Sequence, residues 1–263
     1  MKNIDFFYIN KLTKLHNNKN IFFCKTDFLN QDFHTISQIN NDVILISGNS
    51  DYAITDDIVN IAPKNIKKWY CQNAISKHSI ICPIPIGMEN KTDPDRPGHG
   101  IAYPERVAQK ESIINALSDT KPTKFIYSNF NCFTNLKHRL PLKELSIKTD
   151  YIYWQEPNLS LEQMFNKFID HKMVLCPAGN GIDTHRLWEV LYSNRIPITI
   201  KIGEYKIYEL YNLLPIIVLD SLDELLDKEL IDEKYAIAKT KSKNTKLNIL
   251  DSQYWIETIE SIL

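Results

Sequence analysis

The sequence predicts an α/β protein with two facing domains, each a parallel sheet with helices packed on it. Short apolar runs typical of buried strands alternate along the chain with stretches whose apolar residues recur at helical spacing. The segment 173–200 has the full order strand, turn, helix and strand, the building block of a parallel sheet. A polar break at 121–123 (Lys-Pro-Thr) interrupts the chain, so we place the domain boundary near residue 120.

In the first half, strands are predicted at 4–9, 21–24, 42–47 and 80–87, the last interrupted by prolines. Helices are predicted near 36–39 and over 66–73 and 105–119. Ligands gather beyond the carboxyl ends of strands in open α/β sheets. The polar residues after the strand at 42–47 are therefore candidate site residues, although an ordinary polar loop explains them equally well: Asn49, Ser50 and Asp51.

The second half begins with a strand at 124–128, and a helix carrying Arg139 follows it. Later strands and helices alternate in the same way, and Ser160 with Gln163 has the spacing of a capping box at the start of a helix. The further strands are predicted at 151–154, 173–175, 196–200 and 214–219, and the helices from 159, from 187, and over 205–210, 221–226 and 252–263.

Composition limits the classes of function. The 263 residues carry a formal net charge of −1, and no polybasic field indicates a nucleic-acid partner. The five cysteines are scattered and odd in number, which fits reduced thiols in a cytosolic protein better than a disulfide framework. No apolar segment is long enough to span a bilayer and no targeting signal is evident, so we expect a cytoplasmic protein.

The most informative segment is 176–189, with the sequence CPAGNGIDTHRLWE. A glycine-bearing turn leads into a helix whose first residues follow two good N-cap types. A helix N-terminus offers free N–H groups and a positive dipole end, which suit a phosphate, and cations in the first turn predict that an external anion completes the site. The simpler interpretation is a tight turn followed by surface charges. The candidate residues are Gly179, Asn180, Gly181, Asp183, Thr184, His185, Arg186 and Glu189.

This segment continues into VLYSNRIPITI, and the whole of 176–200 resembles the nucleotide-binding segment of exostosin-like glycosyltransferases. In that family a Pro/Gly turn leads to an Arg, a Glu on the next helix, a small-residue turn and an I-P-I/V strand. The match covers about one tenth of the chain. The phrase PIPIGMEN at 83–90 is similar to one in the acceptor-side half of these proteins.

A second element carries the resemblance in the donor-binding half. The order of a strand, Ser128-Asn129 and Arg139 resembles the first donor-binding element of exostosin-like enzymes and of α1,3-fucosyltransferases. There the Arg holds the donor diphosphate, so the resemblance implies this role for Arg139. Lys137 and His138 lie at the same helix start and compete for the role, and an Arg on a solvated helix face is the simpler interpretation.

The resemblance implies the GT-B architecture, two facing Rossmann-like domains, here in a compact form. The acceptor-side domain would span 1–120, the nucleotide-sugar domain 121–250, and a terminal helix at 251–263 would pack back towards the first domain. The implied reaction moves a sugar from a UDP- or GDP-sugar, GDP-fucose among the candidates, to a hydroxyl of a surface glycan such as lipopolysaccharide or capsule. The enzyme would work in the cytoplasm, in peripheral contact with the inner membrane.

Departure of the diphosphate builds negative charge that an enzyme must stabilise. Arg186, Arg139, His185 and the helix N-terminus are expected to do this without a metal or other cofactor. The sequence has one Asp-x-Asp pair, Asp93 and Asp95, and it lies in a Pro-rich loop that does not follow a clear strand end.

The remaining roles concern the sugar and the acceptor. Glu189, one turn beyond His185, is expected to accept hydrogen bonds from ribose hydroxyls. Inverting transfer requires a base from the first domain, and Glu89 is the first choice and Asp51 the second.

Two other classes of function were weighed. A catalytically silent glycan-binding or complex-forming subunit on the same scaffold stays open, because the base is not identified. A nucleotide-sugar epimerase or other oxidoreductase is disfavoured, because the chain lacks the Gly-x-Gly-x-x-Gly pattern.

Overall fold

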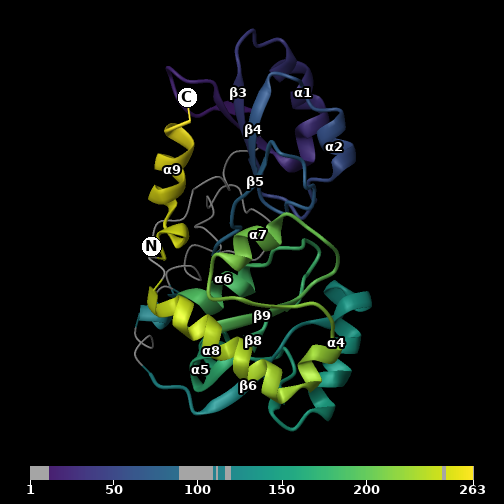
Figure 1. The fold of residues 1–263 in the computed structure, drawn as a ribbon, viewed down its shortest axis with the longest axis vertical. Coiled ribbons are helices and arrows are strands. Elements are labelled where there is room, and N and C mark those ends of the chain that lie inside the picture. The colour runs from purple at the N-terminus through teal and green to yellow at the C-terminus, as the bar shows by residue number, and fades with distance from the viewer. Residues whose placement is uncertain (1–11, 89–108, 111, 116–119, 245–246, 263) are drawn as a thin grey trace.

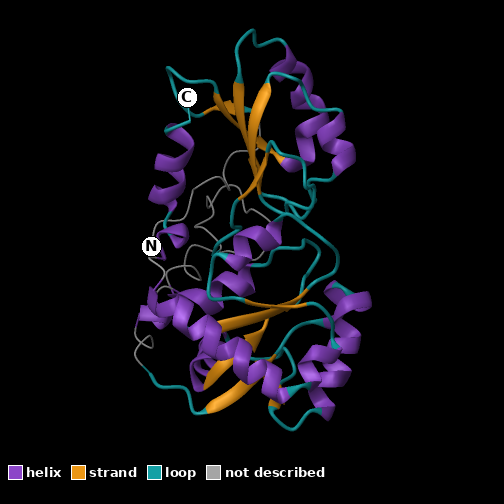
Figure 2. Cartoon of the chain, viewed as in Figure 1, coloured by secondary structure: helices purple, strands orange, loops and turns teal. Residues whose placement is uncertain are grey.

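The described chain forms two mostly parallel sheets with helices around them. The computed structural model describes residues 12–88, 109–110, 112–115, 120–244 and 247–262. Within them, strands and helices alternate in both halves (Figure 2), so the predicted α/β class is confirmed and is compatible with a Rossmann-like fold.

The first sheet lies in the upper part of Figure 1 and follows the order of the sequence. β1 is antiparallel to β2, and the other neighbours are parallel. Every residue of β3 is buried, as in a parallel strand covered on both faces. The strands are β1 (Thr13–Lys14), β2 (Ile21–Lys25), β3 (Val43–Gly48), β4 (Ile66–Cys71) and β5 (Ile81–Pro83), and the helices are α1 (Leu29–Ser37) and α2 (Asp56–Asn60).

Residues 66–71 form strand β4, so the predicted helix over 66–73 is wrong. Trp69 and Tyr70 point to opposite faces and join different core clusters, which the period of a strand requires. Pairing with β3 on one side and β5 on the other satisfies the backbone. In this six-residue segment the strand pairing, together with the fit of aromatic side chains to a pleated surface, outweighs the helical spacing of the apolar residues.

The second sheet is wholly parallel and has the order β10-β9-β8-β6-β7. The chain adds β7 on one side of β6 and then β8 on the other, so the strand order reverses beside β6. In open α/β sheets, ligands bind at the carboxyl edge near such a reversal. The strands are β6 (Lys124–Ser128), β7 (Ile152–Trp154), β8 (His171–Leu175), β9 (Ile196–Ile200) and β10 (Ile217–Leu219).

Helices connect these strands and extend beyond them. The Ser160–Gln163 capping box is confirmed at the start of α5, whereas the helix predicted over 221–226 is a 3-10 turn. The sequence analysis missed α8, whose surface is largely exposed and polar and therefore has a weak apolar period. The helices are α4 (Leu136–Lys148), α5 (Leu161–Asp170), α6 (His185–Tyr192), α7 (Ile207–Asn212), α8 (Lys228–Asn244) and α9 (Ser252–Glu260).

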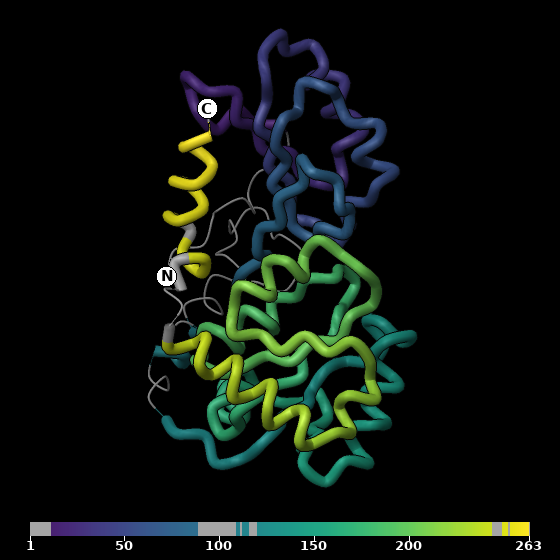
Figure 3. Tube along the Cα trace, viewed as in Figure 1, coloured from purple at the N-terminus to yellow at the C-terminus, as the bar shows by residue number. Residues whose placement is uncertain are grey.

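A shared apolar cluster joins the two halves. It contains Ile46 from β3, Tyr127 from β6, Trp188 from α6 and Trp255 from α9. After α8 the chain returns, and α9 lies beside the first half in Figure 3, where Lys19 Nζ donates to the carbonyl of Glu260. The two sheets are thus held by a continuous core and by the returning C-terminal helix.

Two predicted elements fall wholly or partly outside the described residues. The strand at 4–9 is outside them, and of the predicted helix at 105–119, residues 109–110 and 112–115 are helical. Among the helices of the described segments, none has the length and apolarity to cross a bilayer.

Candidate functional site

The segment singled out in the sequence folds as the predicted strand, turn and helix. β8 ends at Leu175 and α6 begins at His185. Thr184 occupies the N-cap position, but its side chain caps nothing, and its Oγ1 is buried with no hydrogen-bond partner in the described chain. The first turn of α6 carries no acid, so the positive end of the helix dipole is not balanced there.

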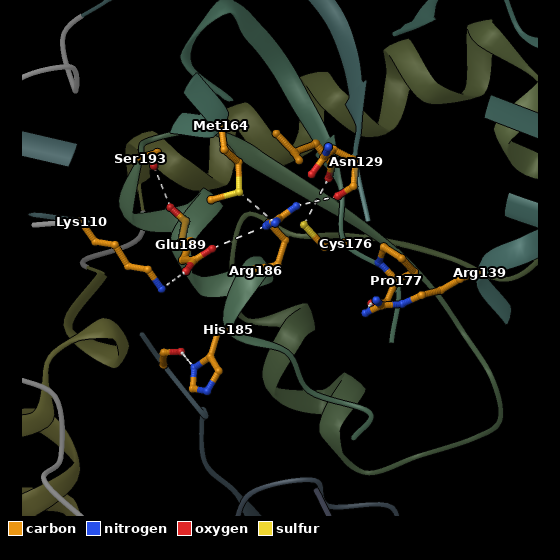
Figure 4. A network of polar contacts seen from close by, with 12 residues as sticks. Lys110, Asn129, Arg139, Met164, Cys176, Pro177, His185, Arg186, Glu189 and Ser193 are labelled. Carbon is orange, nitrogen blue, oxygen red and sulfur yellow. Dashed lines mark hydrogen bonds and ion pairs between the residues drawn. The ribbon is translucent and has the colours of Figure 1, made fainter. Parts of the chain in front are cut away.

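Arg186 reaches from this first turn to the carboxyl end of β6 (Figure 4). Its Nη1 donates to the Asn129 carbonyl at 2.7 Å, and its Nη2 lies 3.0 Å from Met164 Sδ. The guanidinium carbon is 5.0 Å from the centre of the Phe168 ring. Nε lies 3.5 Å from Glu189 Oε2, and within the described chain it has no hydrogen-bond partner. The Arg186 side chain is 25% exposed, whereas its unused donor Nε is buried and faces Glu189.

Glu189 lies on the same side of α6 and is buried between two cations. Its Oε1 accepts from Lys110 Nζ at 2.6 Å, and its Oε2 faces Arg186. Burial by itself raises the pKa of Glu189, but the charges of Lys110 and Arg186 outweigh it, so the pKa is lowered. The expected contact with ribose hydroxyls would therefore compete with an ion-pair network that already occupies both oxygens.

Arg139 stabilises the turn after β8 by hydrogen bonds to its main-chain carbonyls. Its Nε donates to the Ala178 carbonyl at 2.8 Å, Nη1 to the Asn131 carbonyl at 2.9 Å, and Nη2 to the Pro177 carbonyl at 3.3 Å. A Cβ at Gly179 would come within 3.1 Å of Nη2, so the glycine leaves room for the guanidinium. Desolvation and the nearby charge of Arg186 lower the pKa of Arg139 to about 10. The two guanidinium groups thus repel each other across the turn.

Asp183 holds the two halves together. Its Oδ1 accepts from Trp188 Nε1 at 2.8 Å and Tyr211 OH at 2.7 Å, and its Oδ2 accepts from the Ile86 N–H at 2.8 Å. Burial raises the pKa of Asp183, although these three hydrogen bonds act in the opposite direction. Because the carboxylate is buried and its oxygens are occupied, its place in the structure is that of a structural anchor and not of a donor contact.

Asn73 and Gly181 complete this anchor. Asn73 has a left-handed backbone with φ 51° and directs its side chain between the halves. Its Nδ2 donates to the Ser50 carbonyl at 2.9 Å, and its Oδ1 accepts from the Asp183 N–H at 2.9 Å. A Cβ at Gly181 would lie 2.7 Å from Asn73 Oδ1, so only glycine permits this approach. Gly181 therefore serves the junction between the halves.

The structure brings other predicted residues together across this junction. Asn180 Nδ2 donates to Asp51 Oδ2 at 3.3 Å, and both residues are exposed. His185 Nδ1 donates to the Gly87 carbonyl at 2.8 Å. Asp51 therefore lies beside the turn that precedes α6. The other base candidate, Glu89, and the Asp93/Asp95 pair lie outside the described residues.

Ser128 and Asn129 are buried, and their side chains bond within the second half. Ser128 Oγ is 3.0 Å from Ser146 Oγ of α4, and Asn129 Nδ2 donates to the carbonyls of Gln155 and Glu156. In this arrangement the main-chain carbonyl of Asn129, and not its side chain, reaches the site by accepting from Arg186.

A cavity of about 200 Å³ opens at the carboxyl edge of the second sheet. Its walls come from the residues that follow β8, β9 and β10 and from the first turn of α4. Lys137, His138 and Lys201 supply its polar walls, and Pro177 and Leu222 part of its apolar walls. It lies where the strand order predicts a ligand site in a parallel α/β sheet.

Lys110 is the functional candidate that sequence reasoning missed. It belongs to a short helical stretch whose exposed described residues are polar, and no local signal in the sequence distinguishes it from a solvated lysine. Its partner Glu189 is 79 residues away, so only the folded chain reveals the pair. No group of three or more His, Cys, Asp or Glu side chains in the described segments is placed to hold a metal ion.

Comparison with protein-family models and with curated protein sequences finds no match to this chain. The resemblance to exostosin-like glycosyltransferases therefore stays a prediction, and the functional argument depends on the site itself.

Proposed function

We propose that this chain is a glycosyltransferase that uses a nucleotide-diphosphate sugar. The observation that carries the proposal is the proximity of two guanidinium groups, that of Arg186 in the first turn of α6 and that of Arg139, which contacts the turn after β8. Lys110 and Glu189 complete the network, which holds more positive than negative charge. A diphosphate would relieve the repulsion between the two guanidinium groups and balance this surplus.

The position of the site supports the same proposal. The turn and the 200 Å³ cavity both lie at the carboxyl edge of the second sheet. We propose that the nucleotide occupies this cavity, with the phosphates directed towards Arg186. Glu189 would orient Arg186 and Lys110 towards the phosphates. Arg139 would hold the turn after β8 and add its positive charge to the site.

The proposed reaction is an inverting transfer without metal, in which the cations stabilise the leaving diphosphate. The acceptor hydroxyl would approach from the first half in a GT-B arrangement of two facing domains. Asp51, which accepts a hydrogen bond from Asn180 in the turn, would be the second candidate for the base, and Glu89 the first. We further propose a surface glycan as acceptor and a cytoplasmic place of action at the inner membrane.

One observation favours the alternative, a silent subunit on the same scaffold. The side chains of Ser128, Asn129 and Asp183 all bond within the protein, so several of the expected donor contacts serve structure instead. A silent subunit would bind a nucleotide sugar or glycan without turning it over.

Titration with UDP, GDP and their sugars, followed by calorimetry and by product analysis, tests the proposal. Arg186→Ala should weaken nucleotide-diphosphate binding by about tenfold to a hundredfold, as expected for the loss of one charge-assisted contact of about 2–3 kcal/mol. The control Lys148→Ala, which removes an exposed charge from the far end of α4, should bind normally. Binding without product would support the silent subunit, and equal binding by Arg186→Ala and wild type would refute the assigned site.

A further inference from the structure

A second cavity, of about 350 Å³, lies at the opposite edge of the second sheet. Lys172 of β8 and Ile196 of β9 line it at the amino ends of their strands, and α8 covers it with Tyr235 and Lys239. This edge is remote from the turn after β8, which follows the carboxyl end of the same strand. The cavity is therefore separate from the proposed donor site.

Arg195 gives this cavity a permanent positive wall. The residue is buried, and its guanidinium donates to main-chain carbonyls, among them Ile169 at 2.9 and 3.1 Å and Asn194 at 2.9 Å. Burial lowers the pKa of Arg195. The negative charge of Asp170 raises this pKa, but Asp170 itself forms an ion pair with Lys124. In the described chain no carboxylate forms an ion pair with Arg195, so its charge is matched by carbonyl dipoles alone.

Four lysines add to this charge, and none of them has an acidic partner in the described residues. Lysines elsewhere in this half commonly do, as in Lys201 with Asp220 at 2.6 Å and Lys228 with Asp232 at 2.6 Å. Among the described residues, the cavity lining contains no Asp or Glu. The unpaired lysines are Lys121, Lys172, Lys239 and Lys243.

Aromatic contacts order two of these lysines. Lys172 Nζ lies 5.6 Å and Lys239 Nζ 5.7 Å from the centre of the Tyr235 ring. The ring attracts both cations and keeps their N–H donors beside the cavity. A chain with a net charge of −1 thus places five cations around one cavity, and none of them has an ion-pair partner in the part of the chain that the structure describes.

We propose that this cavity binds a multivalent phosphate-bearing anion. The lysines would supply hydrogen bonds to the phosphate oxygens. Arg195, whose donors are bonded to main-chain carbonyls, would contribute only its positive charge from the cavity wall. Leu191, Pro215 and Tyr235 offer an apolar wall to the organic part of such a ligand. The phosphate belongs either to a small soluble molecule or to a lipid headgroup. This site does not depend on transferase activity.

Pyrophosphate is the first probe, with binding to the full-length protein measured by calorimetry at low salt. With the candidate donor site disabled by Arg186→Gln in both proteins, the added substitutions Lys172→Gln/Lys239→Gln should weaken binding by about tenfold to a hundredfold. The matched control Lys64→Gln/Lys67→Gln removes the same charge from an exposed surface of the first half and should bind normally. Circular dichroism establishes that each variant is folded.

Two further experiments locate the binding site and identify the source of the phosphate. Arg186→Gln, which disables the candidate donor site, should retain pyrophosphate binding at the second cavity. Co-sedimentation with phosphatidylglycerol vesicles, against phosphatidylcholine vesicles, distinguishes a lipid headgroup from a soluble phosphate, and either source supports the proposal if the lysine variant loses it. Binding unaffected by the lysine variant, or no binding of either probe, would overturn it.

Discussion

Replacing Glu189 with Gln tests the central charge network. The carboxylate is 2.6 Å from Lys110 Nζ and 3.5 Å from Arg186 Nε, and the side chains of Glu189 and Lys110 are only 6% and 7% exposed. Gln keeps the shape but removes the charge, so two cations lose their shared counter-charge. Breaking a buried pair by removing one partner costs about 3–5 kcal/mol. At about 2–4 °C for each kcal/mol, the melting temperature should fall by roughly 6–20 °C.

The pH dependence of this effect has a definite sign. The pKa of Glu189 in the folded protein is lowered from its ordinary value near 4.5. Its contribution to the free energy of unfolding is therefore complete above pH 4.5 and is lost as the pH falls through the folded pKa. The difference in stability between wild type and Glu189→Gln should be largest near neutral pH and shrink in acid.

Urea unfolding at several pH values measures both quantities, and a double-mutant cycle isolates the pair. Lys110→Met leaves Glu189 with Arg186, and the double variant Lys110→Met/Glu189→Gln removes both charges of the pair. Because a buried pair is often replaced by apolar residues at little cost, the double variant should be less destabilised than the sum of the single variants. A loss below about 1 kcal/mol for Glu189→Gln, or strictly additive losses, would refute the reasoning.

Two further predictions test contacts between the halves, and two test the proposed reaction. Asp183→Asn should lower the free energy of unfolding by about 1–3 kcal/mol in urea titrations, since an amide N–H₂ would face one of three donors, whereas the exposed Asp57→Asn should not. Gly181→Ala should cost about 1–3 kcal/mol, because the new Cβ would press on Asn73, and a variant of normal stability would show that the contact is loose. Transferase activity should survive excess EDTA, and a strict Mn²⁺ or Mg²⁺ requirement would contradict the metal-free mechanism. Glu89→Gln should lower turnover by about 10²–10⁴-fold with unchanged donor affinity in calorimetry, and full activity would transfer the role of base to Asp51.

Local patterns allowed much of the fold to be predicted. The apolar runs predicted as strands at 21–24, 42–47 and 196–200 form β2, β3 and β9, because buried parallel strands are apolar on both faces. The capping box of α5 was also predicted from the local sequence and is confirmed. The error at β4 arose because helical and strand periods are hard to separate in six residues, and the pairing that decides between them comes from β3 and β5.

The sequence by itself determined the strand, turn and helix order around Arg186 and the placement of cations in the first turn of α6, because both depend on residues close together in the chain. The partners of those residues were decided by the tertiary structure alone. Lys110 meets Glu189 across 79 residues, and Asn73 meets Asp183 across 110. No local pattern specifies such pairs, because they depend on how the two sheets pack. Packing therefore made Asp183 an anchor between the halves and placed Glu189 between Lys110 and Arg186.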